Sequence, residues 1–209
     1  LNNGETGSVT FIGTVSPAGG NLKEPVTEST KKAARCFYAL SQNRADSKRY
    51  PAIDTLDSYS KYLEYPEFIE FSKEKLDENW VELVNEARNI LVRGKETEEQ
   101  INILGDDSVP IDYHVTLWKS EFVDFVILQQ DAFDKIDATT SLERQEFMLK
   151  KVINVTRSEF KFEGFEEVGT YFKRLINVFR QMNYTVFKSE EFFMAEAEAN
   201  AVLEERIIK

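Results

Sequence analysis

The sequence has one cysteine, one histidine and no apolar run near the roughly 18 residues that a membrane span requires. A single cysteine excludes a disulfide within the chain, and we expect Cys36 to be a small core residue on an amphipathic helix of a cytosolic protein. No charged and then apolar leader opens the sequence, so neither a signal peptide nor a membrane span is expected. The first residue is Leu1 and an apolar segment follows closely, so we expect a piece of a longer protein.

Motifs for phosphate and metal binding are also absent. There is no GxxxxGKS/T loop, no GxGxxG after a strand, and no Cys and His cluster with metal-ligand spacing, so no metal site is predicted. His114 has no partner that spacing identifies, and a surface or boundary position is favoured over a catalytic base. Acidic pairs such as Glu166 and Glu167 favour solvated helix faces, with a carboxylate acid/base site as the alternative.

Basic residues are fewer than acidic ones, 26 against 37, which gives a net charge of −11. This charge disfavours binding to nucleic acid or to an anionic membrane surface and leaves basic protein partners as the electrostatic preference. No nucleic acid partner and no direct membrane insertion are therefore predicted. Hydrophobic residues make up 42% of the 209 residues, which is sufficient for a core.

The first part of the chain has the pattern of a mixed α/β layer. Residues 8–16 (SVTFIGTVS) are rich in β-branched and aromatic residues and predict one strand. A loop of turn-forming residues follows, and a helix is predicted to start near Ser29 or Thr30 and to run to about residue 43. We therefore expect residues 1–65 to form the edge of an α/β domain, consisting of strand, loop and helix.

From Pro66 onward, apolar residues recur at three- and four-residue steps, which predicts a helical bundle over residues 66–209. The predicted fold class is thus mainly α, with a short α/β part at the N-terminal end. The last segment, residues 189–208, has the Ala and Glu content of a helix but few core residues, so we expect it to fray or to dock on a neighbour. Three stripes are interpreted as core rather than cofactor contacts: Trp80, Leu83, Val84, Ala87, Ile90 and Leu91; Ile111, Val115, Trp118, Phe122, Phe125 and Val126; and Val168, Phe172, Leu175, Ile176, Phe179 and Met182.

Residues 105–110 (GDDSVP) interrupt two of these helices abruptly. Glycine ends the first helix, acidic and Ser side chains can cap the second, and Pro110 suits its first turn, so the simpler interpretation is a helical-hairpin connection. The functional alternative is an exposed acidic tip, with Asp106 and Asp107, that presses on a partner.

Several segments resemble one known family in order and spacing. Residues 7–27 (GSVTFIGTVSPAGGNLKEPVT) resemble the GSV-x-x-IG-x-VSP-x-GG-x-x-x-EPVT stretch of V/A-type ATPase catalytic A subunits. Residues 49–54 (RYPAID), 58–62 (SYSKY) and 129–137 (QQDAFDKID) resemble the family segments R-H-F-P-S-I-N-W, S-Y-S-x-Y and Q-Q-N-A-F-D-x-V-D. The EPVT segment favours this family over the F-type beta subunits. The sequence is therefore identified as a member of this family, in its C-terminal portion.

The resemblance implies that the first part is a remnant of a nucleotide-binding domain. The phosphate loop and the catalytic residues of the family lie upstream, so no catalytic residue is assigned here. The aromatic positions of the family's adenine pocket fall on Tyr50 and Phe133, whose rings would clamp adenine by stacking. The cofactors implied are ATP or ADP with Mg²⁺ in the full subunit, with none expected to bind tightly to this portion alone. Tyr50 stands where the family has Phe, and it retains the ring face.

The resemblance also implies function and partners. The full subunit would couple ATP hydrolysis or synthesis to rotation of a central stalk and to H⁺ or Na⁺ transport, and this portion alone should be inactive. Asp106 and Asp107 fall where the family has its rotor-facing tip. The implied partners are the B subunits, which alternate with the A subunits in a hexamer, the D and F subunits of the central stalk, and the subunits of the peripheral stalk. The implied location is cytoplasmic, peripheral on the membrane through the complex. The alternative is a free-standing, non-catalytic helical interaction module.

Overall fold

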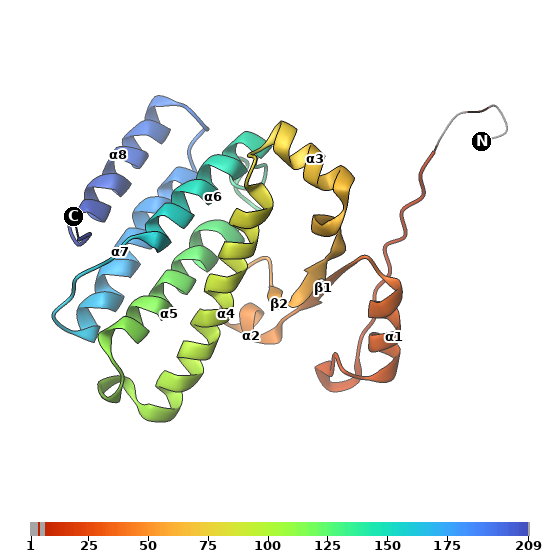
Figure 1. The fold of residues 1–209 in the computed structure, drawn as a ribbon, viewed down its shortest axis with the longest axis horizontal. Helices are drawn as coiled ribbons and strands as arrows, with labels where there is room; N and C mark the ends of the chain where they lie inside the picture. Colours follow the sequence, from red (N-terminus) through yellow and green to blue (C-terminus); the bar gives the residue numbers. More distant parts are fainter. Residues whose placement is uncertain (1–3, 5–6, 209) are drawn as a thin grey trace.

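The computed structural model describes residue 4 and residues 7–208, and it is mainly helical with a short two-stranded sheet near the N-terminal end (Figure 1). This confirms the predicted fold class. The N-terminal part contains helix α1 (Pro25–Ala33), strand β1 (Cys36–Leu40), helix α2 (Gln42–Asp46) and strand β2 (Ile53–Ser60). The helical part contains α3 (Pro66–Lys75), α4 (Trp80–Leu104), α5 (Ile111–Val123), a π-helix (Asp124–Leu128), α6 (Leu142–Arg157), α7 (Phe165–Asn183) and α8 (Glu190–Glu204).

The predicted strand over residues 8–16 is wrong. These residues form no strand, and Phe11 and Ile12 are almost fully exposed. Figure 1 shows the segment projecting away from the rest of the chain. A strand requires a neighbour that accepts its backbone hydrogen bonds, and none of the described residues provides one for this segment. The β-branched composition of residues 8–16 is therefore not sufficient to form a strand without a partner strand.

The predicted helix over residues 29–43 is also wrong in its bounds. The helix begins earlier, at Pro25, where proline suits the first helical position, and it ends at Ala33. The chain then forms β1, so Cys36 lies half-buried in a strand rather than on an amphipathic helix. Its Sγ atom lies 3.2 Å from Oγ of Ser60, the residue opposite it on β2.

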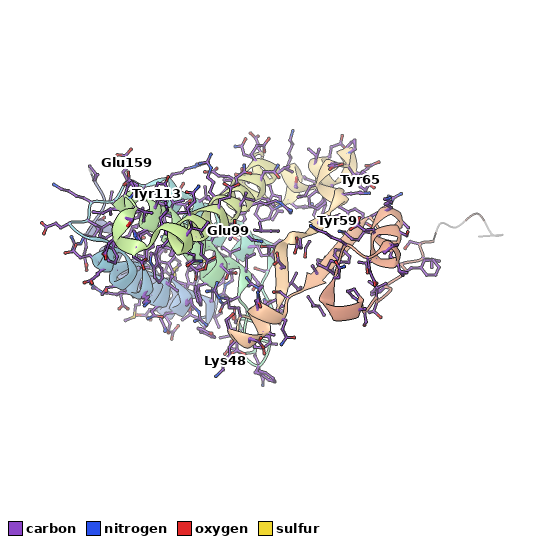
Figure 2. The ribbon with its side chains drawn as sticks, turned by 90° about the horizontal axis from the view of Figure 1, so that it is seen from below. Lys48, Tyr59, Tyr65, Glu99, Tyr113 and Glu159 are labelled. Carbon is purple, nitrogen blue, oxygen red and sulfur yellow. The ribbon has the colours of Figure 1, made fainter. Side chains whose placement is uncertain are left out.

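The sheet is an antiparallel pair of β1 and β2, in which Leu40 lies opposite Ile53. The pairing is irregular between Phe37 and Ala39. Tyr59 connects this sheet to α1, because its hydroxyl donates to the backbone oxygens of Lys31 and, at 3.2 Å, Ala34 (Figure 2). Strand β2 was not predicted, and it provides the support on which β1 forms.

The helices of the C-terminal part start and end as their local sequences dictate. Ser141 and Ser189 precede α6 and α8 and accept hydrogen bonds from the backbone N–H groups of Arg144 and Phe192, at 3.3 and 3.2 Å. Gly105 ends α4 with a φ of 86°, a backbone conformation that favours glycine. The predicted helical bundle is confirmed.

The hydrophobic core lies among α4, α5, α6, α7 and α8, which run side by side in Figure 1. Phe122 of α5 and Phe179 of α7 are fully buried and meet edge to face, with ring centroids 4.8 Å apart. All three predicted apolar stripes contribute to this core, either as buried residues or as half-buried residues packed against it. The helical periodicity of the sequence therefore located the core correctly.

Helices α4 and α5 approach closely where Gly94 faces Ser120. A Cβ atom at position 94 would lie 2.1 Å from the Ser120 Cβ, well inside any real contact distance. Glycine is thus required at this crossing, and the two helices are held as one closely packed pair.

Helix α8 docks on α7 and adds Phe192, Ala199 and Val202 to the core, more than the sequence indicated. The Tyr171 hydroxyl of α7 donates to the backbone oxygens of Val202 and Leu203, both at 3.2 Å, and burial raises the pKa of this hydroxyl. Across the described residues, no helix combines the length and apolar character needed to cross a membrane.

Candidate functional site

Tyr50 lies in the loop between α2 and β2, two residues after Lys48, which Figure 2 shows at an edge of the molecule. Its side chain is 54% exposed, and its hydroxyl lies 3.4 Å from the backbone oxygen of Ala45. Ser41 caps α2 by accepting from the Arg44 N–H, which sets the direction in which this loop leaves the sheet. The Tyr50 ring is therefore available to a planar ligand.

Phe133 lies in the loop that follows the π-helix, and its side chain is 98% exposed. Carboxylates of the same loop shape it: the Phe133 N–H donates to Asp131 at 2.9 Å, and the N–H groups of Ile136 and Asp137 donate to Asp134 at 2.9 and 2.8 Å. An apolar ring exposed to this extent on an ordered loop is consistent with a ligand contact.

The two loops are joined directly although they lie far apart in the sequence. The backbone N–H of Gln130 donates to the backbone oxygen of Tyr50 at 2.9 Å. The structure therefore brings the segments that carry Tyr50 and Phe133 together. The rings form no aromatic pair with each other among the described residues, and the role predicted for them stays a prediction.

Asp137 anchors the Phe133 loop from inside. Its carboxylate accepts from the Asp131 N–H at 2.6 Å, and its backbone oxygen accepts from the Gln130 side chain at 2.6 Å. Burial raises the pKa of the Asp137 carboxyl above its ordinary value of 3.8, against the opposing effects of the Asp131 N–H and the Arg144 charge. The guanidinium of Arg144, itself buried, donates to the backbone oxygen of Met182.

This raised pKa predicts a pH dependence. A carboxyl whose pKa is higher in the folded than in the unfolded state contributes stability that is fully present below the unfolded pKa, and that is lost as pH rises through the folded pKa. We expect the free energy of unfolding of the unaltered chain, minus that of Asp137→Asn, to fall as pH rises above about 4, the ordinary pKa of an aspartate carboxyl. Urea denaturation at a series of pH values from below about 4 upward measures it, and a difference that stays flat or rises with pH would contradict the assignment.

Two arginines and two acids form an ion-pair cluster beneath the Tyr50 loop, which we call the joint: Arg44, Arg49, Glu121 and Asp124. Arg49 binds Glu121 with both terminal nitrogens, at 3.0 and 2.8 Å, and also binds Asp124 at 2.8 Å. Arg44 binds the other oxygen of Asp124 at 2.8 Å. Burial opposes the charged form of Arg49, but the carboxylates of Glu121 and Asp124 outweigh it and raise the pKa of Arg49.

The π-helix gives Asp124 its position in the joint. Asp124 is its first residue and is 3% exposed, and its backbone oxygen accepts from the Gln129 N–H at 3.0 Å. Asn183 of α7 donates to the backbone oxygen of Val126 at 2.9 Å, which supports the widened turn. The π-helix continues α5 and ends where Gln129 becomes extended, and π-helical turns are frequent at functional sites. The Arg49 guanidinium also lies over the Phe125 ring, 4.8 Å from its centroid.

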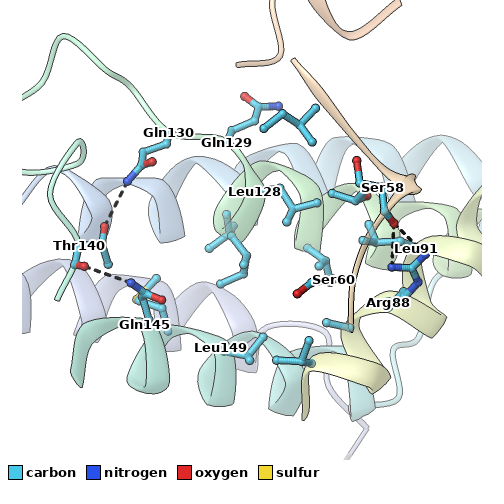
Figure 3. Close-up of a pocket in the computed structure, with 18 of the residues that line it drawn as sticks. Ser58, Ser60, Arg88, Leu91, Leu128, Gln129, Gln130, Thr140, Gln145 and Leu149 are labelled. Atoms are coloured by element: carbon cyan, nitrogen blue, oxygen red, sulfur yellow. Dashed lines mark hydrogen bonds between the residues drawn. The ribbon is translucent and has the colours of Figure 1, made fainter. Parts of the chain in front are cut away.

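A cavity of about 580 Å³ separates the sheet from the helices (Figure 3). Ser58 and Ser60 of β2 face it from one side, and Arg88 and Leu91 of α4 and Leu149 of α6 line its other walls. The packing between the N-terminal part and the bundle is therefore open at its centre.

The segment between α4 and α5 connects two helices, as the helical-hairpin interpretation predicted, and it exposes Asp106 and Asp107; the contact of this tip with a partner stays a prediction. The surface or boundary position expected for His114 is wrong, because its side chain is buried. One ring nitrogen lies 3.2 Å from the backbone oxygen of Asp106, and the ring stacks on Phe165 with centroids 5.0 Å apart. Since α7 begins at Phe165, this stacking fixes the tip to the end of a neighbouring helix.

The joint was missed from the sequence. Its partners lie 72 to 80 residues apart along the chain, so no local motif records them. One signal was present: Asp124 interrupts the apolar run of residues 122–128 (FVDFVIL). An acid inside an apolar run is expected to be buried and paired with a cation. No group of three or more His, Cys, Asp or Glu side chains in the described part of the chain could hold a metal ion.

Comparison with known families gives the class of protein. Residues 1–60 match the nucleotide-binding domain of the ATP synthase alpha/beta family, and residues 70–162 match the C-terminal domain of V and A type ATP synthase. The chain belongs to the family of V-type ATP synthase alpha chains, and it corresponds to their C-terminal portion, the end of the nucleotide-binding domain plus the C-terminal domain.

Individual relatives agree with this assignment. The V-type ATP synthase alpha chain of Borrelia duttonii (strain Ly) is 40% identical over 192 residues, which are 92% of this chain and 31% of that protein. The V-type ATP synthase alpha chain of Protochlamydia amoebophila (strain UWE25) is 36% identical over 206 residues, which are 99% of this chain and 34% of that protein. The chain thus spans about a third of the length of these relatives.

Among solved structures, a chain described as a unique ATP synthase subunit NeqB from Nanoarcheaum equitans aligns with a TM-score of 0.48 and 19% identity, over 68% of this chain and 33% of that chain. A likeness of this size is too weak to support a functional inference.

Proposed function

We propose that this chain is the C-terminal part of the catalytic subunit of a V/A-type rotary ATPase or ATP synthase. The complete subunit would couple hydrolysis or synthesis of ATP to rotation of a central stalk and to transport of H⁺ or Na⁺. The observation that carries this proposal is the 40% identity to a V-type ATP synthase alpha chain over 92% of the chain.

Within the proposal, this portion supplies the adenine side of the nucleotide site. Tyr50 and Phe133 are exposed aromatic side chains on two loops that the Gln130 N–H joins at 2.9 Å. Such rings suit the flat, apolar faces of adenine. Phosphate and Mg²⁺ would be held by residues of the complete subunit outside this chain, because the described residues contain neither a phosphate loop nor a metal-binding cluster.

In this proposal, movement of the helical part would turn the central stalk. The α4–α5 tip with Asp106 and Asp107 is exposed and would meet the central stalk, while the B subunits and the peripheral stalk would contact other surfaces. The chain's net charge of −11 favours basic stalk residues as the tip's contacts. This assignment to the family's partners rests on the resemblance of the sequence.

The adenine role is tested by replacing each aromatic residue in the complete subunit. We expect Tyr50→Ala and Phe133→Ala each to weaken ATP binding about tenfold, since stacking on one base is worth roughly 1–3 kcal/mol. Tyr50→Phe should retain an affinity within about twofold of the unaltered protein, because the ring remains. Isothermal titration with ATP and Mg²⁺ measures the three affinities.

Phe193→Ala is the matched control, since Phe193 is an exposed phenylalanine on α8. Its replacement should leave ATP affinity unchanged. If Tyr50→Ala and Phe133→Ala bind ATP as Phe193→Ala does, the adenine assignment is wrong. If ATP does not bind to the unaltered protein at all, the free-standing interaction module becomes the better interpretation.

A further inference from the structure

The N-terminal part and the helical bundle are connected across the cavity by a small set of polar contacts. Apolar packing cannot transmit a displacement through an open space of about 580 Å³. A movement of the Tyr50 loop therefore reaches the bundle through contacts around this space, among them the bond from the Gln130 N–H to the Tyr50 carbonyl.

Two arginine-mediated attachments join the N-terminal part to the helices: Arg88 in the cavity wall, and the joint outside it. Arg88 of α4 donates to the backbone oxygens of Leu56 and Ser58, at 3.1 to 3.3 Å, and it is exposed (Figure 3). The joint is stronger, because it consists of charge-assisted hydrogen bonds of 2.8 to 3.0 Å that meet at the buried carboxylate of Asp124. Arg49 also binds Glu121 in a bidentate geometry, which fixes the direction of the contact as well as its distance.

The joint lies between the loop that carries Tyr50 and helix α5, which leads to the α4–α5 tip. Arg49 is the residue directly before Tyr50, and Glu121 lies in the last turn of α5. The other end of α5 begins at Ile111, immediately after the tip that carries Asp106 and Asp107. Helix α5 is about 20 Å long at 1.5 Å per residue, and it is packed closely on α4 at Gly94. A displacement at Glu121 is therefore carried along a stiff helix pair to the tip.

We propose that the joint is the contact through which nucleotide occupancy at the Tyr50 loop moves the α4–α5 tip, with Glu121 and Asp124 as positioning residues that act through Arg49. This inference rests on the proposed function, since it assumes that a nucleotide binds beside Tyr50. Coupling between sites is established by a measured interaction, not by spatial continuity, so the test is a set of coupled substitutions.

The experiment uses the complete subunit in its assembled complex. Ser108 at the tip is changed to cysteine and labelled with an environment-sensitive fluorophore, after Cys36 and any cysteine elsewhere are replaced. ATP with Mg²⁺ is titrated, and both the affinity and the change in tip fluorescence at saturation are recorded. In Glu121→Gln we expect the fluorescence change to fall at least twofold while the ATP affinity stays within about twofold.

Three further variants make the result specific. Arg49→Lys keeps the charge but loses the fork, so we expect the same loss of tip response, and the double variant should lose no more than either single one. Glu86→Gln is the matched control: Glu86 also binds an arginine with both oxygens, Arg157 at 2.8 and 2.6 Å, but this pair connects α4 to α6 away from the joint. It should retain the full response.

The outcomes separate the two proposals. ATP binding with a full tip response in both Glu121→Gln and Arg49→Lys would overturn the joint and leave the nucleotide site intact. Additive losses in the double variant would also overturn it, because independent effects do not identify a shared contact. Absence of ATP binding in the unaltered complex would instead overturn the proposed function, and the joint with it.

Discussion

Asp124→Ala is expected to lower the free energy of unfolding of this chain by about 3 kcal/mol, because it removes one partner of a buried ion pair and leaves the Arg44 charge uncompensated. The side chain of Asp124 is 5% exposed and that of Arg44 is 15% exposed, so water cannot replace the lost carboxylate at Arg44. Arg49 is 27% exposed and retains Glu121, which keeps the effect below the upper end of the range. Urea denaturation followed by circular dichroism measures the change.

Glu96→Ala is the matched control for this substitution. Glu96 is an exposed acid on α4, and its loss should change the free energy of unfolding by less than about 0.5 kcal/mol. If Asp124→Ala destabilises the chain no more than Glu96→Ala does, the joint contributes no net stability and its geometry does not reflect a strong attachment.

Gly94→Val should destabilise the chain by about 3 kcal/mol, because the α4–α5 crossing has no room for a side chain. The first added atom would lie 2.1 Å from the Ser120 Cβ, which belongs to the base of a side chain and cannot swing aside. The helices would have to separate, and the core contacts of Phe122 in α5 would be lost with them. Thermal and urea unfolding of the variant measure the loss.

Asn89→Val provides the comparison for Gly94→Val, since Asn89 is exposed on the same helix and valine there causes no clash. Valine and asparagine have nearly equal helix propensities, whereas valine in place of glycine gains a few tenths of a kcal/mol, so helix propensity opposes the expected loss in Gly94→Val and cannot cause it. Adding Ser120→Gly to Gly94→Val should restore part of the stability by reopening the crossing. A Gly94→Val variant as stable as Asn89→Val would show that the two helices are not held as a rigid pair.

The helical part of the fold could be predicted because its information is local. The stripes that begin at Trp80, Ile111 and Val168 repeat at the period of a helix, and each has one apolar side that must be covered. The end of α4 at Gly105 and the start of α8 after Ser189 follow from single residues with strong positional preferences.

The N-terminal part could not be predicted in the same way, because strands depend on partners. Residues 8–16 have strand-like composition without a neighbouring strand, whereas Cys36–Leu40 became a strand because Ile53–Ser60 pairs with it. Strand propensity is dominated by the neighbours that a residue meets. The sequence pattern does not show that residues 8–16 lack a partner strand, nor that Cys36–Leu40 has one. The division of the chain at residue 65 stays a prediction.

The candidate site, too, could be predicted where its residues form a local motif and not where they meet only in the folded chain. Tyr50 and Phe133 were identified from motif resemblance, and the Gln130 N–H that joins their loops could not be identified that way. The joint requires Arg44 and Arg49 to meet Asp124, and only the folded chain brings them together. Asp124 itself could have been singled out as an acid in an apolar run, but its partners could not.

The π-helix at residues 124–128 also constrains how this region can change in length during evolution. A π-helical turn contains one residue more than the α-helical turn it replaces, and is thus equivalent to a single-residue insertion. Loss of one residue here would restore a regular α-helical turn and leave the direction of the following segment nearly unchanged, because the wide turn had already absorbed the extra residue. The Gln130 N–H would then keep its direction toward the Tyr50 carbonyl. A one-residue deletion in this segment would therefore be easier to accept than one in the middle of a regular helix such as α4, where it would rotate everything that follows by about 100°.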